Sequence, residues 1–265
     1  MRDGIGFRNQ KSATHLFLAI PFFNGREKPR TEWIQNLVPR KRADFISDLK
    51  IWADVNKHGM TTRFYSNKMN KLNKILFRCV YWFKAPWDVG GPQPIVKELE
   101  QMGQITGRVL DVGCGTGDTA IFLAQKGYEV MGIDFVPKAI EMASARAKRA
   151  GSRIPFSVFD AMKLDQLHIR FDTIIDAGLF HNLSDNDRIY YTCSLESAMV
   201  QGGVFHMLCF SDSQPGFIGP RRISRGEICK TFSQGWHIDS IRETKYKAYY
   251  PIGGAHAWIA SIRKV

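Results

Sequence analysis

Four aspartates follow four apolar segments of the chain, and together they could bind a positively charged ligand. They stand at or near the ends of segments expected to be strands: Asp111, Asp134, Asp160 and Asp176. The carboxyl ends of parallel strands meet at one edge of a sheet, so these side chains are expected to gather there. Crowded like charges cost free energy unless a ligand offsets them. The pattern therefore predicts a cationic ligand at this edge.

A glycine-rich turn follows the first of these strands and limits what the ligand can be. Residues 109–117 read VLDVGCGTG, and such glycines let the backbone turn tightly and approach a ligand. A dinucleotide loop would read GxGxxG, whereas here Asp118 stands at the expected helix start and would repel a pyrophosphate. Asp134 lies 21 residues after Gly113, the spacing expected of a carboxylate that accepts from both ribose hydroxyls. A ribose-containing cation without phosphate is predicted; S-adenosylmethionine fits this description and NAD fits it poorly.

Strand-like and helix-like segments alternate along the C-terminal two-thirds of the chain. Strands are expected at 108–112, 128–133, 155–159, 171–176, 203–210, 236–241 and 255–262. Helices are expected at 93–101, 118–126, 137–151, 184–200 and from residue 224 onward. Strands separated by helices of about ten residues predict an α/β fold with a doubly wound, mostly parallel, seven-stranded sheet.

Several of these stretches together resemble a known family. Residues 109–117 are similar to the glycine motif of the class I S-adenosylmethionine-dependent methyltransferases, and the resemblance extends over roughly residues 86–265. PWDVGGPQP, DAGLFH and LCFSDSQPGFIGPRR resemble more narrowly a small-molecule branch. That branch groups thiopurine, thiol and halide methyltransferases with bacterial enzymes that act on heterocyclic toxins. The resemblance implies a Rossmann-like methyltransferase fold and methyl transfer to sulfur, nitrogen or oxygen of a small apolar or aromatic acceptor.

The resemblance also implies roles for individual residues in binding S-adenosylmethionine. The methionine end would be held by Asp111, Gly113 and Gly115. The ribose hydroxyls would be bound by Asp134, and the adenine would lie against Phe135 and be contacted at its edge by Asp160 and Ala161. The sulfonium would lie near Trp87 and Asp176. The face of Trp87 would attract a sulfonium cation. Structural alternatives remain open: Asp111 as a cap for the following loop, Asp160 as a solvated strand end, and Trp87 as part of the core.

His181 is the candidate general base, because it follows the fourth strand by five residues and should overhang the reacting methyl group. A base is needed only when the acceptor is a hydroxyl or a protonated nitrogen. The alternative is a histidine that orders the loop. Asp212 and His256 could line the acceptor side or lie on the surface. No metal is expected, because the cofactor would occupy the clustered carboxylates.

The positive charge of the protein is confined to its N-terminal third. The 265 residues include 37 basic residues (Lys and Arg) and 25 acidic residues (Asp and Glu). Residues 1–85 hold 17 of the basic and 6 of the acidic residues, whereas residues 86–265 hold 20 basic and 19 acidic residues. The division predicts a basic extension, 1–85, and a methyltransferase domain, 86–265. An amphipathic helix at 63–84 is interpreted as a lid over the acceptor. Membrane-surface contact and nucleic-acid recruitment are the alternatives, and nucleic acid ranks last.

The remaining sequence features concern compartment and assembly. Five cysteines lack metal-site spacing, and no apolar run approaches the ~18 residues that cross a bilayer. A cytoplasmic monomer with reduced thiols is expected. A small molecule is the expected partner, and a cofactor-binding module without catalysis is the rival interpretation.

Overall fold

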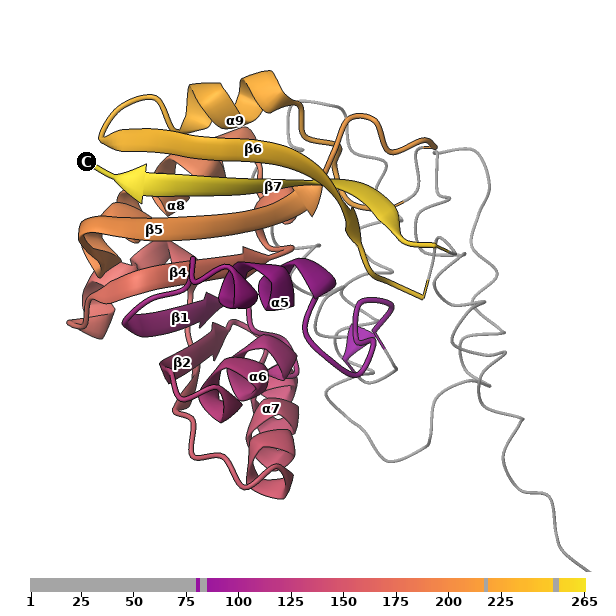
Figure 1. Cartoon of the computed structure of the whole chain (residues 1–265), viewed down its shortest axis with the longest axis vertical. Helices are drawn as coiled ribbons and strands as arrows, with labels where there is room; N and C mark the ends of the chain where they lie inside the picture. Colours follow the sequence, from indigo (N-terminus) through magenta and orange to yellow (C-terminus); the bar gives the residue numbers. More distant parts are fainter. Residues whose placement is uncertain (1–79, 82–84, 217–218, 250–252) are drawn as a thin grey trace, which may run out of the picture. The chain divides into compact units, whose positions relative to one another are not determined.

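Seven strands form one mixed sheet within the part of the chain that the computed structural model describes, residues 80–81, 85–216, 219–249 and 253–265. Their bounds are β1 (Arg108–Val112), β2 (Glu129–Asp134), β3 (Phe156–Val158), β4 (Phe171–Ala177), β5 (Met199–Phe210), β6 (Trp236–Tyr246) and β7 (Ala255–Lys264). The spatial order is β3-β2-β1-β4-β5-β7-β6. All pairings are parallel except those of β7, which runs antiparallel to both β5 and β6 (Figure 1).

The strand order reverses between β1 and β4, and this is where open α/β sheets bind their ligands. The two strands are in register such that Val112 lies opposite Asp176. Asp134 ends β2, which is the neighbour of β1 on the other side. The topology therefore brings three of the four predicted aspartates to adjacent positions at the carboxyl edge of the sheet.

Helices connect the strands, and their ends carry recognisable start signals. The bounds are α5 (Pro94–Gln101), α6 (Asp118–Gln125), α7 (Pro137–Arg149), α8 (Asp185–Ala198) and α9 (Arg225–Thr231), with 3-10 turns η2 (Ala161–Leu167) and η3 (Phe180–Asn182). Proline opens α5 and α7, where its missing N–H is no loss. Ser184 with Asp187 and Ser224 with Glu227 form capping boxes that begin α8 and α9.

Two apolar clusters cover the two faces of the sheet. One holds strand residues such as Leu110 and Ile174 together with Tyr191 and Leu195 of α8. The other holds the adjacent strand residues, such as Val109, together with side chains of α5 and α6. Successive residues of a strand point to opposite faces, so a strand covered on both sides is apolar throughout. This explains the continuous apolar runs from which the strands were predicted.

The predicted fold class is confirmed, and the largest difference lies in β6. The sequence predicted a strand at 236–241, whereas β6 continues to Tyr246. The added residues are mostly polar and exposed because β6 is an edge strand that pairs only with β7. The amphipathic helix expected at 63–84 and the extension 1–85 lie almost wholly outside the described residues, so both stay predictions. In the described part of the chain, no helix has the length and apolar character required to cross a membrane.

The third glycine of the motif is needed for close packing between helix and strand. Gly117 precedes α6 with a φ of 83°, a left-handed conformation that favours glycine. A Cβ on this residue would lie 2.9 Å from Cζ of Phe156 and 3.0 Å from Cβ of Ala143. These contacts indicate that Gly117 permits the close packing of α6 against its neighbours.

Replacing Gly117 should destabilise the protein more than backbone strain alone would. Gly127 is the matched control, since its φ is +93° and no atom lies within 4 Å of a Cβ placed there. Gly127→Ala should cost ~1 kcal/mol of unfolding free energy from left-handed strain. Gly117→Ala should cost a further ~1–3 kcal/mol from overpacking against Phe156 and Ala143. Urea denaturation followed by circular dichroism measures both, and equal losses would contradict the packing role.

Candidate active site

Asp111 is a buried carboxylate in the middle of the carboxyl edge, near the end of β1. One of its oxygens, Oδ2, accepts the backbone N–H of Ala120 in the first turn of α6, at 3.1 Å. Burial is the main cause and, together with the charges of Asp134, Asp176 and Asp118, it raises the pKa of Asp111 from 3.8 to about 8, although the hydrogen bond from Ala120 acts in the opposite direction. The bond to Ala120 is the capping role that the sequence left open as the structural alternative. The charge coupling shows that these carboxylates lie within electrostatic range of one another.

Asp134 joins the end of β2 to the glycine loop. Its Oδ2 accepts the N–H of Gly115 at 3.0 Å, and its Oδ1 accepts the N–H of Val136 at 2.9 Å. The backbone N–H of Cys114 also donates to the carbonyl of Ile133 at 2.8 Å. Burial raises the pKa of Asp134 to about 6, although the hydrogen bonds act in the opposite direction. Each carboxylate oxygen has a second lone pair, so Asp134 can still accept from ligand hydroxyls.

Asp176 is hydrogen-bonded to the loop that follows β4 and to α8. Its Oδ1 accepts the N–H groups of Gly178 and Leu179 at 3.0 and 2.6 Å, and its Oδ2 accepts the N–H of Phe180 and the hydroxyl of Tyr191 at 3.1 and 3.0 Å. These donors occupy the four lone-pair positions of a carboxylate, and the residue is 0% exposed. Direct contact between Asp176 and a ligand stays a prediction that this geometry does not favour. Its charge and the loop that it organises remain at the site.

Arg146 of α7 neutralises part of the acidic edge, which the sequence interpretation did not foresee. It pairs with Asp88 at 2.6 Å and with Asp118 at 3.0 Å, and it also donates to Thr116 of the glycine loop at 2.9 Å. Asp118, which was expected to repel a pyrophosphate, is therefore paired with a guanidinium group. Two carboxylates with one guanidinium still leave a net negative charge at the start of α6, so this end remains unfavourable for a phosphate.

The remaining predicted cofactor residues flank these carboxylates in the sequence. Asp160 accepts the N–H of Met162 through Oδ1 at 3.1 Å and caps η2, while the carbonyl of Ala161 accepts the hydroxyl of Ser194 at 2.7 Å. Phe135 is partly buried directly after β2. Trp87 is also partly buried and packs against the cluster that includes α5 and α6. Asp160 is not among the carboxylates that shift the pKa of Asp111.

His181 is enclosed by aromatic rings on the other side of β4. It is 4% exposed, and its Nδ1 accepts the N–H of Phe210 at 3.1 Å. The ring centroids of Phe210 and Tyr246 lie 4.9 and 6.0 Å from that of His181. Burial and the charges of Arg222 and Arg188 lower its pKa to about 3. The general-base role stays a prediction, and these contacts favour the alternative of a histidine that orders the loop.

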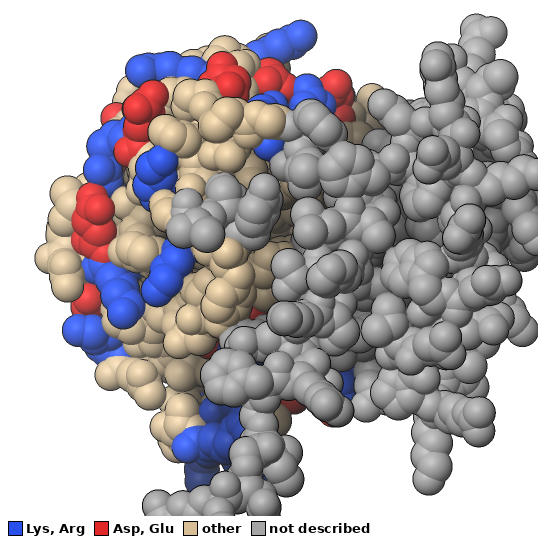
Figure 2. All heavy atoms as spheres, turned by 90° about the vertical axis from the view of Figure 1, so that its right-hand side faces the viewer, with Lys and Arg blue, Asp and Glu red and all other residues tan. Residues whose placement is uncertain are grey.

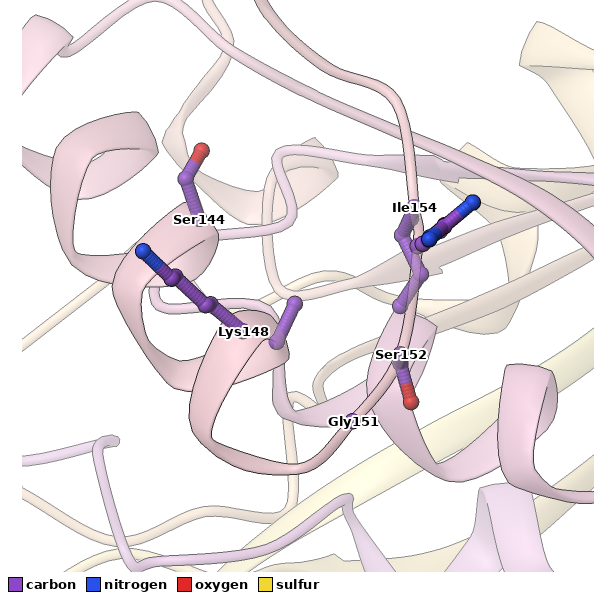
Figure 3. A pocket seen from close by; sticks show the side chains of 7 residues that line it. Ser144, Lys148, Gly151, Ser152 and Ile154 are labelled. Carbon is purple, nitrogen blue, oxygen red and sulfur yellow. The ribbon is translucent and has the colours of Figure 1, made fainter.

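A shallow hollow elsewhere on the surface is not part of this site. It measures about 330 Å³ and lies between the end of α7 and the segment before β3, lined by residues such as Ser144, Lys148 and Ile154 (Figure 3). The end of a connecting helix lies at the opposite edge of the sheet from the carboxyl ends of the strands. Among the described residues, no group of three or more His, Cys, Asp or Glu is arranged to hold a metal ion.

Comparison with known proteins identifies the class of this fold and site. Residues 109–203 match the family described as a methyltransferase domain. Over 168 residues the chain is 34% identical to the 2-heptyl-1-hydroxyquinolin-4(1H)-one methyltransferase of Mycobacteroides abscessus, covering 62% of this chain and 74% of that protein. A solved structure from work on the conversion of a disulfide bond into a thioacetal group in echinomycin biosynthesis is similar with a TM-score of 0.66. It is 34% identical and covers 71% of this chain and 92% of the other.

The fold is also shared with a more distant enzyme. The 1,6-didemethyltoxoflavin-N1-methyltransferase of Burkholderia thailandensis, solved with 1,6-didemethyltoxoflavin and S-adenosylhomocysteine, is 17% identical, with a TM-score of 0.59 over 78% of this chain and 93% of that one. The chain belongs to the S-adenosylmethionine-dependent methyltransferases. The predicted fold, enzyme class and cofactor are confirmed. The chemistry at the carboxyl edge fits the cofactor, because buried carboxylates surround a glycine loop that a cation and ribose hydroxyls could approach.

Cofactor binding should tighten as the pH rises from about 6 to about 8. Asp134 and Asp111 have pKa values raised to about 6 and about 8, so part of the acidic edge is protonated at neutral pH. A bound cation favours the ionised carboxylates, lowers their pKa and so releases protons. For each proton released, affinity should rise by at most about ten-fold per pH unit. Calorimetry in buffers of different ionisation enthalpy counts these protons.

S-adenosylhomocysteine provides the control for this measurement, because it lacks the sulfonium charge. Its affinity should change less over the same pH range. Binding of S-adenosylmethionine that releases no protons and is independent of pH would show that the carboxylates do not respond to the cofactor's charge.

Proposed function

We propose that this protein transfers a methyl group from S-adenosylmethionine to a sulfur, nitrogen or oxygen atom of a small aromatic or apolar acceptor. The cofactor supplies an electrophilic methyl group on a sulfonium sulfur. Asp111, Gly113 and Gly115 would hold its methionine end, and Asp134 its ribose hydroxyls. Phe135, Asp160 and Ala161 would surround the adenine. Trp87 would face the sulfonium, and Asp176 would act through its charge.

The observation that carries this proposal is the crowding of buried carboxylates at the strand-order reversal. Burial raises the pKa values of Asp111 and Asp134, and the neighbouring acids also raise that of Asp111, so a positively charged ligand would stabilise the ionised carboxylates. Arg146 compensates only the start of α6. A cationic nucleoside supplies both the missing charge and the hydroxyls that Asp134 can accept from.

A small aromatic acceptor is supported by the buried aromatic cluster next to the acidic edge and by the relatives. His181, Phe210 and Tyr246 place three rings beside the end of β4. Two of the similar proteins are named for heterocyclic acceptors, a hydroxyquinolone and a didemethyltoxoflavin. On the face that Figure 2 shows, described Lys and Arg side chains are mixed with Asp and Glu, an arrangement less suited to a polyanion than a continuous basic surface.

Replacing Asp134 by asparagine should weaken cofactor binding. Asparagine removes the negative charge and one acceptor position, and hydrogen bonds to charged groups contribute about 1.5–3 kcal/mol, so affinity should fall by roughly ten- to a hundred-fold. Titration calorimetry with S-adenosylmethionine measures the loss. Asp165→Asn is the matched control, since that aspartate is exposed on η2. Equal affinities for the wild type and Asp134→Asn would count against the ribose assignment.

A panel of acceptors tests the catalytic part of the proposal. Thiols, phenols and heteroaromatic amines are incubated with the protein and S-adenosylmethionine, and release of S-adenosylhomocysteine is measured. At least one aromatic acceptor should be methylated well above the rate without protein. Cofactor affinity without release across the panel would favour the rival, a cofactor-binding module.

A further inference from the structure

We propose that the acceptor is an aromatic or heteroaromatic compound with an acidic O–H or S–H group, bound as its anion, and that His181 donates a hydrogen bond to that anion from Nε2. This inference rests on the proposed function and narrows its acceptor class. It replaces the general base with a neutral histidine that binds an already ionised acceptor.

The proton on His181 is placed by its neighbour in β5. The backbone N–H of Phe210 donates to Nδ1 at 3.1 Å, so Nδ1 must present a lone pair. A neutral imidazole carries one proton, which is therefore on Nε2. A general base needs a free lone pair on the nitrogen that faces the acceptor. In this arrangement His181 can donate a hydrogen bond from Nε2, but it cannot take a proton there.

The charged groups around His181 favour a neutral ring and an anionic partner. Arg188 of α8 and Arg222 after β5 both oppose its protonation. Arg188 is 3% exposed, lies 4.6 Å from the ring centroid of Phe180 and pairs with Glu227 at 3.3 Å. Arg222 lies over the ring of Phe210, which itself contacts His181. Two guanidinium groups near this ring raise the cost of an imidazolium and lower the cost of an oxyanion or thiolate.

The titratable side chains packed nearby do not replace His181 as a base. On β6, the hydroxyl of Tyr246 donates to the carbonyl of Ala177 at 3.1 Å, and burial raises its pKa. On β4, the carboxylate of Asp176 accepts from four donors. On β5, burial raises the pKa of Cys209. Burial thus favours the protonated forms of Tyr246 and Cys209, and the lone pairs of Asp176 are already engaged by the four donors.

The three rings also fit a flat acceptor. Phe210 and Tyr246 lie 5.3 Å apart at 64°, and both contact the edge or face of His181. They come from the carboxyl ends of β5 and β6, next to the loop that follows β4. Aromatic rings prefer offset or edge-to-face packing with other rings. An aromatic anion would thus meet an apolar wall and one directed N–H donor.

The chemical step balances without a protein base. The acidic O–H or S–H group loses its proton to solvent before methyl transfer. A lone pair of the anion then forms the new bond to the methyl carbon, while the carbon–sulfur bond breaks and its electron pair stays on the sulfur. The products are the neutral methyl ether or thioether and S-adenosylhomocysteine, so charge is conserved.

The tautomer can be measured without turnover. In ¹⁵N-labelled protein, the His181 ring should show a protonated Nε2 and an unprotonated Nδ1, and should stay neutral through the neutral pH range. The ring signals of His181 are assigned as those that disappear from the spectrum of the His181→Asn variant. His237→Gln removes the signals of an exposed histidine at the start of β6 as a matched control. A proton on Nδ1, or an imidazolium at neutral pH, would overturn the assignment.

Kinetics with matched acceptors test the role of the anion. The pH inflection of kcat/KM should move with acceptor acidity, from near neutrality for a nitrophenol towards ~10 for the parent phenol. His181→Asn keeps an acceptor for the Phe210 N–H but cannot reach the Nε2 position, and should lower kcat/KM by about ten- to a hundred-fold without moving the inflection. His181→Gln, which has an amide donor of greater reach, should recover part of the loss.

Two kinetic results would refute the proposal that His181 donates a hydrogen bond to an anionic acceptor. One inflection shared by both phenols, which disappears in His181→Asn, would establish a base and refute the inference. Methylation of neutral amines with refusal of phenols and thiols would also refute it. In both cases calorimetry would still show that the wild type binds S-adenosylmethionine. Failure of the wild type to bind the cofactor would instead refute the proposed function.

Discussion

The burial of several carboxylates at one edge of the sheet is the constraint on which this structure depends. Asp111 and Asp134 are held beside the glycine loop, and Asp176 raises the pKa of Asp111 from the next strand. The sheet topology enforces this proximity, because β2, β1 and β4 are neighbours whose carboxyl ends coincide. The backbone N–H groups that donate to these acids stabilise their charge only in part. A cationic ligand completes the arrangement.

Different charged groups lie in the two halves of the carboxyl edge, although ion pairs occur in both. The acids lie around β1 and β2, where a cation is needed, whereas Arg188 and Arg222 lie near His181, beyond β4. Asp176 lies between the two halves, and its carboxylate accepts backbone N–H groups of the loop that carries His181. This division would orient a cationic donor and an anionic acceptor towards each other. Alignment of this kind is the main contribution that a protein can make to an in-line methyl transfer.

Local patterns predicted the strands and the glycine loop that form the carboxyl edge, whereas the contacts around His181 join residues that are distant in the sequence. The glycine motif and the spacing to Asp134 are features of neighbouring residues, and apolar runs identify strands that are buried on both faces. Tyr246 could not be placed, because the polar end of β6 shows no apolar pattern and its pairing with β7 is a long-range event. The bond between His181 and Phe210 spans 29 residues and likewise leaves no local signal. Arg146 is ordinary in sequence and becomes important only because α7 packs beside the glycine loop.

The central claim is that this edge accepts a nucleoside with a positive tail and rejects one with a negative tail. Competition between S-adenosylmethionine and ATP, measured by equilibrium dialysis with the labelled cofactor at low salt, tests it directly. The charge arrangement predicts that S-adenosylmethionine stays bound while excess ATP fails to displace it. Efficient displacement by ATP would show that a triphosphate is tolerated beside Asp111 and Asp118, and would contradict the account.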